Sequence, residues 1–212
     1  NKQRQEGPHV HATVLSPDNH ALFVTDLGID KIMLYSFNEK NGSLKLKPNA
    51  AVKLADGSGP RHLDFHPNGK WAYLIQEMAG TVTALHYKNG ALQAFQTIST
   101  LPKDFSQSFS SADIHVSADG KFLYASNRDS SNTIAIFKIQ PSTGKLSLLA
   151  HQSTLGKTPR NFNFDPTGHF LLVANQRSDA IVIFRRNAQS GLLRDTGRRI
   201  DVGNPVCIKW ID

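Results

Sequence analysis

The stretch HPNGKWAYLIQE, residues 66–77, holds a tight turn at Asn68-Gly69 followed by a run of apolar residues. The residues before it, GPRHLDF (59–65), alternate between apolar and polar side chains. Two such runs around an Asn-Gly turn are typical of a β-hairpin. The same hairpin pattern recurs three more times, in SPDNHALFVTD (16–26), SADGKFLYASN (117–127) and DPTGHFLLVAN (165–175).

The four turns are evenly spaced. Their turn residues Asn19, Gly69, Gly120 and Gly168 lie 50, 51 and 48 residues apart. Each hairpin is followed by a third apolar run and by a weaker fourth one after another turn, and no segment has a sustained helical period. Four-stranded units repeating at this length are typical of propeller blades, and two stacked sheets would not require a constant repeat. The sequence predicts an all-β protein, a β-propeller with four four-stranded blades and almost no helix.

The end of the chain resembles the start of another blade. GNPVCIKWID (203–212) matches the beginning of the fourth unit, TPRNFNFD (158–165), and we expect Val206–Ile211 to be the first strand of a fifth blade. Residues 1–8 hold no strands to complete that blade. We therefore expect residues 1–212 to be one propeller domain, the C-terminal portion of a longer ring. The missing N-terminal blades, or a second chain, would close it.

Composition narrows the classes of partner. The formal net charge of +7 permits an anionic ligand, but the basic residues are spread along the chain, so we expect no nucleic acid. The densest basic stretch, RRNAQSGLLRDTGRR (185–199), reads as solvated turn charges. No apolar run is long enough for a membrane helix, and no secretion signal precedes the repeats, so we expect a cytoplasmic protein. The single Cys207 excludes a disulfide framework, and its apolar surroundings predict a buried thiol.

Aligning the hairpins on their turn residues reveals polar residues at the open ends. Arg61 lies eight positions before Gly69, and Glu77 lies eight after it. Because the inner hairpins of a propeller surround a central channel, both ends should meet at the mouth opposite the turn. We predict an Arg61–Glu77 pair on the rim of this mouth. The equivalent positions elsewhere hold His11, Ala112 and Arg160 before the turn, and Leu27, Arg128 and Gln176 after it.

Convergence of His11, Arg61, Glu77, Arg128, Arg160 and Gln176 at one mouth predicts a binding site. Neighbouring polar residues are second candidates for contacting a substrate: Asp26, His62, Asp113 and Asn127. His115 lies further along its strand and fits either the core or the channel. We expect three further histidines, which lie on turns or outer strands, to be ordinary surface residues: His66, His86 and His151.

The four repeats also carry a family resemblance. PHVHATVLSPDNHALFVTDLGIDKI (8–32), GPRHLDFHPNGKWAYLIQE (59–77), ADIHVSADGKFLYASNR (112–128) and TPRNFNFDPTGHFLLVANQ (158–176) resemble the lactonase family of seven-bladed β-propellers. That family includes bacterial 6-phosphogluconolactonases and the related fungal carboxymuconate lactonising enzymes. The resemblance extends over nearly the whole chain and implies a seven-bladed ring, of which about three blades lie outside this sequence.

The resemblance also implies roles. The site of the fungal branch has one histidine, two arginines and one glutamate, which correspond by motif to His11, Arg61, Glu77 and Arg128. His9 lies on the same strand face as His11 and is a possible substitute for it. Arg160 and Gln176 come from the blade alignment alone. We expect His9, Arg160, Gln176, His62 and Asp113 to contact the substrate.

These side chains suit hydrolysis of a small anionic sugar lactone. An ordinary histidine titrates in the range that a general base needs, and arginines hold a phosphate and polarise a carbonyl. Glu77 would orient Arg61 or His11, or act as the base if burial raised its pKa. No serine-esterase elbow, metal motif or dinucleotide fingerprint is present, so we expect no cofactor and no metal. A cation held by a His with an Asp or Glu around the propeller axis is the alternative. A muconate-type lactonising enzyme and a non-catalytic binding propeller remain as alternatives.

Overall fold

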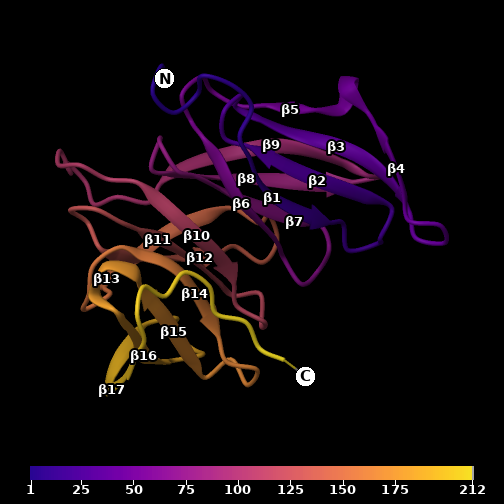
Figure 1. Ribbon diagram of the computed structural model, residues 1–212. Helices are drawn as coiled ribbons and strands as arrows, with labels where there is room; N and C mark the ends of the chain where they lie inside the picture. Colours follow the sequence, from indigo (N-terminus) through magenta and orange to yellow (C-terminus); the bar gives the residue numbers. More distant parts are fainter. Residues whose placement is uncertain (212) are drawn as a thin grey trace.

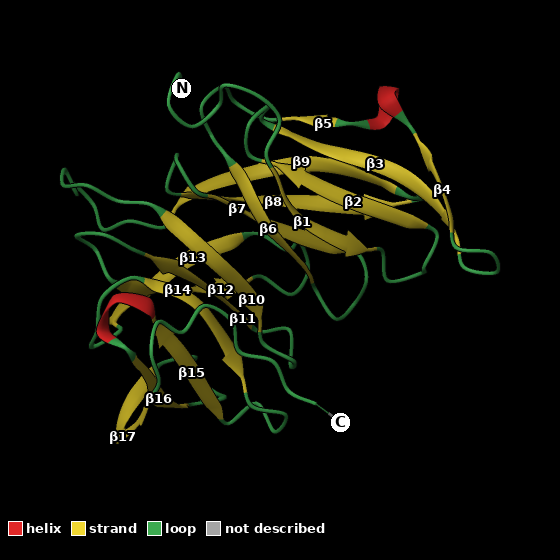
Figure 2. Cartoon of the chain, in the orientation of Figure 1, coloured by secondary structure: helices red, strands yellow, loops and turns green. Residues whose placement is uncertain are grey.

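The computed structural model describes residues 1–211 as four antiparallel sheets with two short 3₁₀ turns, η1 (Pro48–Ala50) and η2 (Gln176–Ser178) (Figure 2). The all-β prediction is confirmed. Blade one contains β1 (Val10–Leu15), β2 (Ala21–Asp26), β3 (Lys31–Asn38), β4 (Ser43–Leu46) and the short β5 (Val52–Lys53). Blade two contains β6 (Pro60–Phe65), β7 (Trp71–Gln76), β8 (Thr81–Lys88) and β9 (Ala91–Ser99).

Blades three and four repeat this order. Blade three contains β10 (Ser111–Val116), β11 (Phe122–Asn127), β12 (Thr133–Ile139) and β13 (Leu146–Ser153). Blade four contains β14 (Pro159–Phe164), β15 (Phe170–Asn175), β16 (Ala180–Arg186) and β17 (Leu193–Asp201). The first strands β1, β6, β10 and β14 contact one another in sequence, and Figure 1 shows them along the inner edge of an arc. No helix among residues 1–211 has the length and hydrophobicity to cross a bilayer.

The hydrophobic cores lie between blades. Ile75 and Val82 of blade two pack with Ile114 and Leu123 of blade three, and similar clusters join blades one to two and three to four. Blades two and three therefore bury both apolar faces against neighbouring blades, while blades one and four each bury one face in this way.

The turn residues adopt the left-handed conformation that Asn and Gly tolerate, with φ of 56° at Asn19 and 67° at Gly69. Gly120 is also a point of contact between blades. A Cβ there would lie 2.7 Å from Nε2 of His66, whose ring nitrogen lies 2.9 Å from the Gly120 carbonyl oxygen. His66 is thus a contact between blades and not an ordinary surface residue. The same expectation is wrong for His151, whose Nε2 lies 2.9 Å from the Thr100 carbonyl oxygen. It is confirmed for His86, which is exposed and stacks on Phe95.

The segment 206–211 runs beside β14 but is not a strand. The Ile208 amide donates to Asn161 Oδ1 (2.7 Å), and Asn163 Nδ2 donates to the Ile208 carbonyl (3.1 Å). These are side-chain contacts, and no strand among residues 1–211 forms a backbone ladder with the segment. The predicted position is therefore right and the predicted strand is wrong. Cys207 is exposed, contrary to expectation, because the neighbouring Ile208 takes the apolar contact on Leu172 and Ala174.

The basic stretch near the end contains one residue with a different role. Arg186 is 8% exposed, and its Nη2 lies 3.1 Å from Oδ2 of Asp119 in blade three. Its Nε donates to the Gly168 carbonyl oxygen at 2.9 Å. The expectation of solvated turn charges is wrong for Arg186, which joins blades three and four.

Candidate functional site

The open ends of the hairpins meet as the equal offsets predict. The Glu77 amide donates to the Gly59 carbonyl at 2.7 Å, and the Arg128 amide donates to the Ser110 carbonyl at 2.7 Å. The residue after each second strand is thus tied to the residue just before the first strand of the same blade. Leu27 is bonded to His9 in the same way, and Gln176 to Thr158.

A β-bulge aims the site residues of the first strands. In three blades the pairing of the first two strands skips one residue, between Val10 and Ala12, between Pro60 and His62, and between Pro159 and Asn161. The skipped residues are His11, Arg61 and Arg160. A bulge turns a side chain out of the regular alternation, and here it directs these three toward one cavity.

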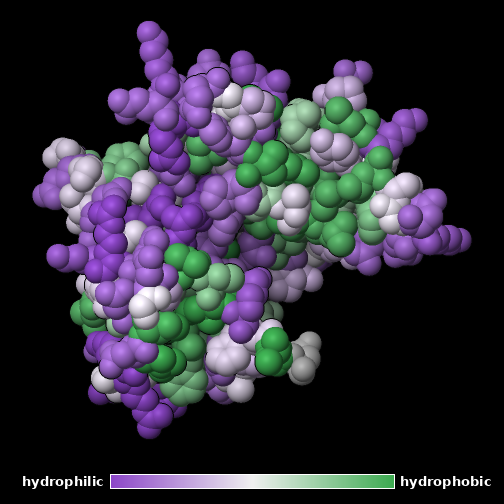
Figure 3. Space-filling view, in the orientation of Figure 1, coloured by the Kyte–Doolittle hydropathy of each residue, from purple (hydrophilic) through white to green (hydrophobic). Residues whose placement is uncertain are grey.

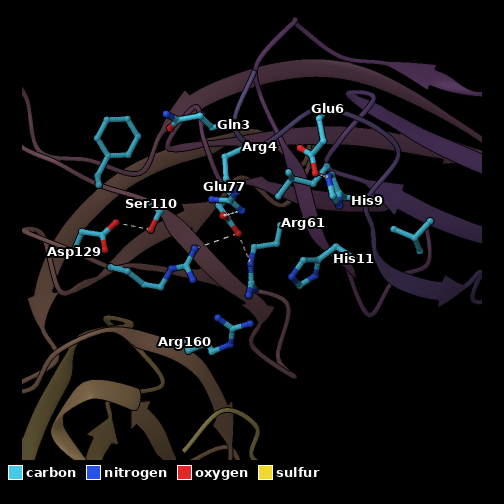
Figure 4. Close-up of a pocket in the computed structure, with 14 residues that line it drawn as sticks. Gln3, Arg4, Glu6, His9, His11, Arg61, Glu77, Ser110, Asp129 and Arg160 are labelled. Atoms are coloured by element: carbon cyan, nitrogen blue, oxygen red, sulfur yellow. Dashed lines mark hydrogen bonds and ion pairs between the residues drawn. The ribbon is translucent and has the colours of Figure 1, made fainter. Parts of the chain in front are cut away.

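The cavity has a volume of about 750 Å³. Figure 4 shows its walls, with the guanidinium groups of Arg4 and Arg61 on either side of the Glu77 carboxylate. Its lining includes the predicted His9, His11, Arg61, Glu77, Arg128 and Arg160, together with Gln3, Arg4, Glu6, Ser110 and Asp129. The structure therefore brings together all four residues for which the sequence predicts a catalytic role.

Glu77 is the centre of an ion-pair cluster. Its Oε2 lies 2.9 Å from Arg61 Nε and 3.1 Å from Arg128 Nη2, and its Oε1 lies 2.6 Å from Arg4 Nη2. Burial alone would raise the pKa of Glu77, but the charges of Arg128, Arg4 and Arg61 hold it below its usual value. Glu77 is therefore a carboxylate that orients arginines. The condition for Glu77 to act as the general base, a pKa raised by burial, is therefore not met.

Arg61 lies deeper than predicted. Its side chain is 2% exposed, and its Nη1 donates to the carbonyl of Ala112 in the next blade at 2.5 Å. Burial and the charge of Arg128 lower the pKa of Arg61 to about 10, so it stays protonated at neutral pH. The predicted Arg61–Glu77 pair is confirmed, but its position on an exposed rim is wrong, because the guanidinium spans two blades.

His11 lies against the cationic cluster. Burial, followed by the charges of Arg61 and His62, lowers the pKa of His11 to about 3. The imidazole is therefore neutral at physiological pH, and the expected ordinary titration range is wrong. Its Nδ1 is buried with no hydrogen-bond partner within residues 1–211. The Nε atom of Arg128 is likewise buried without a hydrogen-bond partner within residues 1–211.

His62 and Asp113 lie beside the cavity and do not line it. Asp113 is 1% exposed and its Oδ1 lies 2.6 Å from His62 Nδ1, while its Oδ2 lies 3.2 Å from His115 Nε2. Asp113 also accepts hydrogen bonds from Asn161 Nδ2 (2.5 Å) and from the Phe162 amide (3.1 Å). The carboxylate thus joins blades two, three and four. The ring centroids of His62 and His11 lie 5.0 Å apart, so the network around Asp113 packs against His11 through His62.

Burial alone would lower the pKa of His115, but the Asp113 carboxylate outweighs burial and raises it. For Asp113 the two histidines outweigh burial and lower the pKa. Asp113 is therefore ionised, and neighbouring donors already bind both of its carboxylate oxygens. Its role is structural, and the expected contact with substrate is not supported. His115 belongs to this buried network beside the channel.

Of the remaining predicted residues, some line the cavity and others do not. Arg160 lines the cavity and makes no ion pair within residues 1–211. His9 also lines it, with Nε2 at 2.9 Å from Glu6 Oε1. Gln176 begins the turn η2 and is not among the lining residues, so its predicted contact with the cavity is wrong. Asp26 accepts from the His9 amide (2.7 Å), and Asn127 lies in a buried network with Thr100.

The sequence did not predict Arg4, because it precedes the first repeat and has no counterpart in the blade alignment. Ser110 and Asp129 were missed for a related reason: both lie in loops outside the compared offsets, where Ser110 Oγ donates to Asp129 Oδ2 at 2.6 Å. Within the described part of the chain, no group of three or more His, Cys, Asp or Glu residues is arranged to hold a metal ion.

Comparisons with known proteins show the family of this chain. The model of the family described as "Lactonase, 7-bladed beta-propeller" matches residues 1–210. A 6-phosphogluconolactonase of Formosa agariphila is 46% identical over 91% of this chain, and one of Bacillus subtilis is 37% identical over 99%. This chain spans 55% and 59% of the length of these two relatives.

Solved structures give the same result. The periplasmic gluconolactonase PpgL of Pseudomonas aeruginosa superposes with a TM-score of 0.93 at 38% identity, and the match covers 98% of this chain and 58% of that one. A crystal structure from Bacteroides fragilis has a TM-score of 0.93 at 42% identity, covering 100% of this chain and 60% of that one. The repeat, the fold and the family match together establish that the chain belongs to the seven-bladed β-propeller lactonase family.

Proposed function

We propose that this protein hydrolyses a sugar lactone at the cavity around Glu77, and that the substrate is 6-phosphogluconolactone. The observation that carries the proposal is the cluster of Arg4, Arg61 and Arg128 on one carboxylate, next to a neutral His11. The relatives from Formosa agariphila and Bacillus subtilis, both named 6-phosphogluconolactonase, support the reaction and the substrate.

The chemistry is attack of water on the lactone carbonyl carbon. His11 accepts a proton from the water as its oxygen bonds to that carbon, and the carbonyl oxygen becomes an oxyanion. When the intermediate collapses, the bond from this carbon to the ring oxygen breaks and His11 returns the proton to that oxygen. The product acid then ionises. An anionic substrate offsets the guanidinium charges that lower the pKa of His11, and so makes it a better base in the complex.

Arg61 and Arg128 supply the electrostatic stabilisation. Both are fixed by Glu77 and largely buried, with side chains 2% and 10% exposed. Donors that are already oriented, in a site with little water, stabilise a developing oxyanion without having to reorganise. The role of Glu77 is then to hold the two guanidinium groups in place.

We also propose that the four blades are part of a larger ring and that the reaction takes place in the cytoplasm. Apolar side chains on the outer face of blade four support the first point, with Phe170 38% exposed and Ile200 45% exposed. In Figure 3, hydrophobic surface is visible over the first and last blades, with a hydrophilic region between them. The proposal of a cytoplasmic reaction rests on the phosphate group of the proposed substrate. The similar Pseudomonas structure, by contrast, is named a periplasmic gluconolactonase, without a phosphate in the name of its substrate.

The test is lactone hydrolysis by the complete protein. We expect turnover of 6-phosphogluconolactone well above the spontaneous rate, and a loss of roughly 10²-fold in kcat/KM for His11→Gln. His20→Gln is the matched control, because His20 is 78% exposed on a turn and outside the cavity. A complete protein that binds sugar acids but does not accelerate hydrolysis would be a binding propeller, and the proposal would be rejected.

A further inference from the structure

The segment before the first blade forms one wall of the cavity. Gln3, Arg4 and Glu6 all line it. Gln5 Nε2 donates to the Leu27 carbonyl at 2.9 Å, and Gly7 packs so closely on Gly28 that a Cβ on Gly28 would clash with the Gly7 oxygen. The segment is therefore fixed to blade one, and the position of Arg4 over blade two is part of the fold.

Arg4 differs from the other arginines bound to Glu77. Its side chain is 52% exposed, against 2% for Arg61 and 10% for Arg128. Only its Nη2 is used, in the 2.6 Å contact with Glu77 Oε1, and no other side-chain hydrogen bond of Arg4 is formed within residues 1–211. A guanidinium carries five N–H donors, so Arg4 keeps an open edge that can donate two parallel hydrogen bonds.

The ion-pair cluster around Glu77 has an excess of positive charge that a second anion could balance. Three guanidinium groups share this one carboxylate, while the other two carboxylates of the cavity have other partners. Glu6 pairs with His9 (2.9 Å), and Asp129 accepts from Ser110 (2.6 Å). A cluster with more cations than anions attracts a negative group, and a half-exposed arginine binds one at a smaller desolvation cost than a buried arginine does.

We infer that Arg4 is the residue that selects a phosphorylated lactone, by donating to the phosphate monoester while Glu77 holds its other edge. The inference rests on the proposed function, because it assigns the anionic end of that substrate to Arg4 and the carbonyl end to Arg61 and Arg128. Arg4 is a binding residue here and takes no part in proton transfer.

The test compares two lactones and two variants of the complete protein. Arg4→Gln should lower the ratio of kcat/KM for 6-phosphogluconolactone to kcat/KM for gluconolactone by roughly 10- to 100-fold, mainly through KM. Lys2→Gln is the matched control, since Lys2 is exposed in the same segment and outside the cavity, and the ratio should stay unchanged. Arg4→Lys should restore part of the ratio, because an ammonium lacks the fork that binds phosphate in two places.

Calorimetry with 6-phosphogluconate and gluconate separates this inference from the proposed function. Arg4→Gln should weaken binding of the phosphorylated acid by a similar factor, whether or not the protein hydrolyses lactones. Equal losses for both lactones and both acids would mean that Arg4 acts only through Glu77, and the inference would fall while the lactonase proposal stood. If the complete protein does not hydrolyse lactones and Arg4→Gln selectively weakens binding of 6-phosphogluconate, the role of Arg4 in phosphate binding would be supported and the proposed hydrolysis would be rejected.

Discussion

Replacing Glu77 by glutamine removes the one carboxylate that three arginines share. The side chain is 5% exposed and accepts from Arg4 at 2.6 Å, Arg61 at 2.9 Å and Arg128 at 3.1 Å. Glutamine has nearly the same shape, but it is neutral and presents donor hydrogens where one oxygen stood. Breaking a buried ion pair while the partner charge remains typically costs about 3–5 kcal/mol. We expect Glu77→Gln to lower the free energy of unfolding of the complete protein by an amount in this range.

The assay is urea unfolding at pH 7, with Glu6→Gln as the control. Glu6 is also a glutamate of this cavity, but its side chain is 62% exposed and pairs only with His9, so its replacement should leave the unfolding midpoint unchanged. kcat/KM of Glu77→Gln should fall as well, because Arg61 and Arg128 lose their common anchor. Equal stability of the two variants would show that Glu77 does not hold the arginine cluster together.

The pH dependence provides a second check of the same variant. The pKa of Glu77 is lowered in the folded protein, below the ordinary 4.5. Its contribution to stability is therefore complete above about pH 4.5 and is lost as the pH falls through the folded value. The stability difference between the parent and Glu77→Gln should stay constant at neutral pH and shrink in acid. A difference that persists undiminished in acid would contradict the assignment of a charged Glu77.

Three further predictions concern the histidines. Because the pKa of His11 is about 3, its neutral form persists as the pH falls, and the acidic limb of the pH profile of kcat/KM should lie well below 6.5; a limb centred near 6.5 would contradict this. The stability that a neutral His11 contributes is present above pH 6.5 and falls between 6.5 and about 3, and His11→Gln should remove this dependence in unfolding experiments. Asp113→Asn should lower the pKa of His115 in an NMR titration, since the Asp64 charge is then the only carboxylate charge that opposes burial, and an unchanged value would show that Asp113 is not its partner.

The fold was predictable because its information is local and repeated. Asn19 and Gly69 occupy turns that need positive φ, and the apolar runs beside them have the two-residue period of strands. A repeat of about 50 residues then specifies blades, and fixed offsets from the turns place Arg61 and Glu77 together. These inferences need only the covalent chain and hairpin geometry. The predicted strand at residues 206–211 was wrong because the prediction used only the local pattern of residues. A strand also requires a neighbouring strand to which its backbone can form hydrogen bonds.

The chemistry of the site depends on contacts between distant segments. Arg61 is buried because blade three, with the Ala112 carbonyl, lies beside it, and the pKa of His11 is low because Arg61 lies close to it in space. Arg4 reaches Glu77 across 73 residues of sequence. Desolvation and Coulomb energy depend on distance and burial, which a single strand's pattern does not contain. The local pattern of the chain thus specifies the blades and the meeting of His11, Arg61, Glu77 and Arg128, whereas packing between distant segments adds Arg4 and sets which side chains are buried or charged.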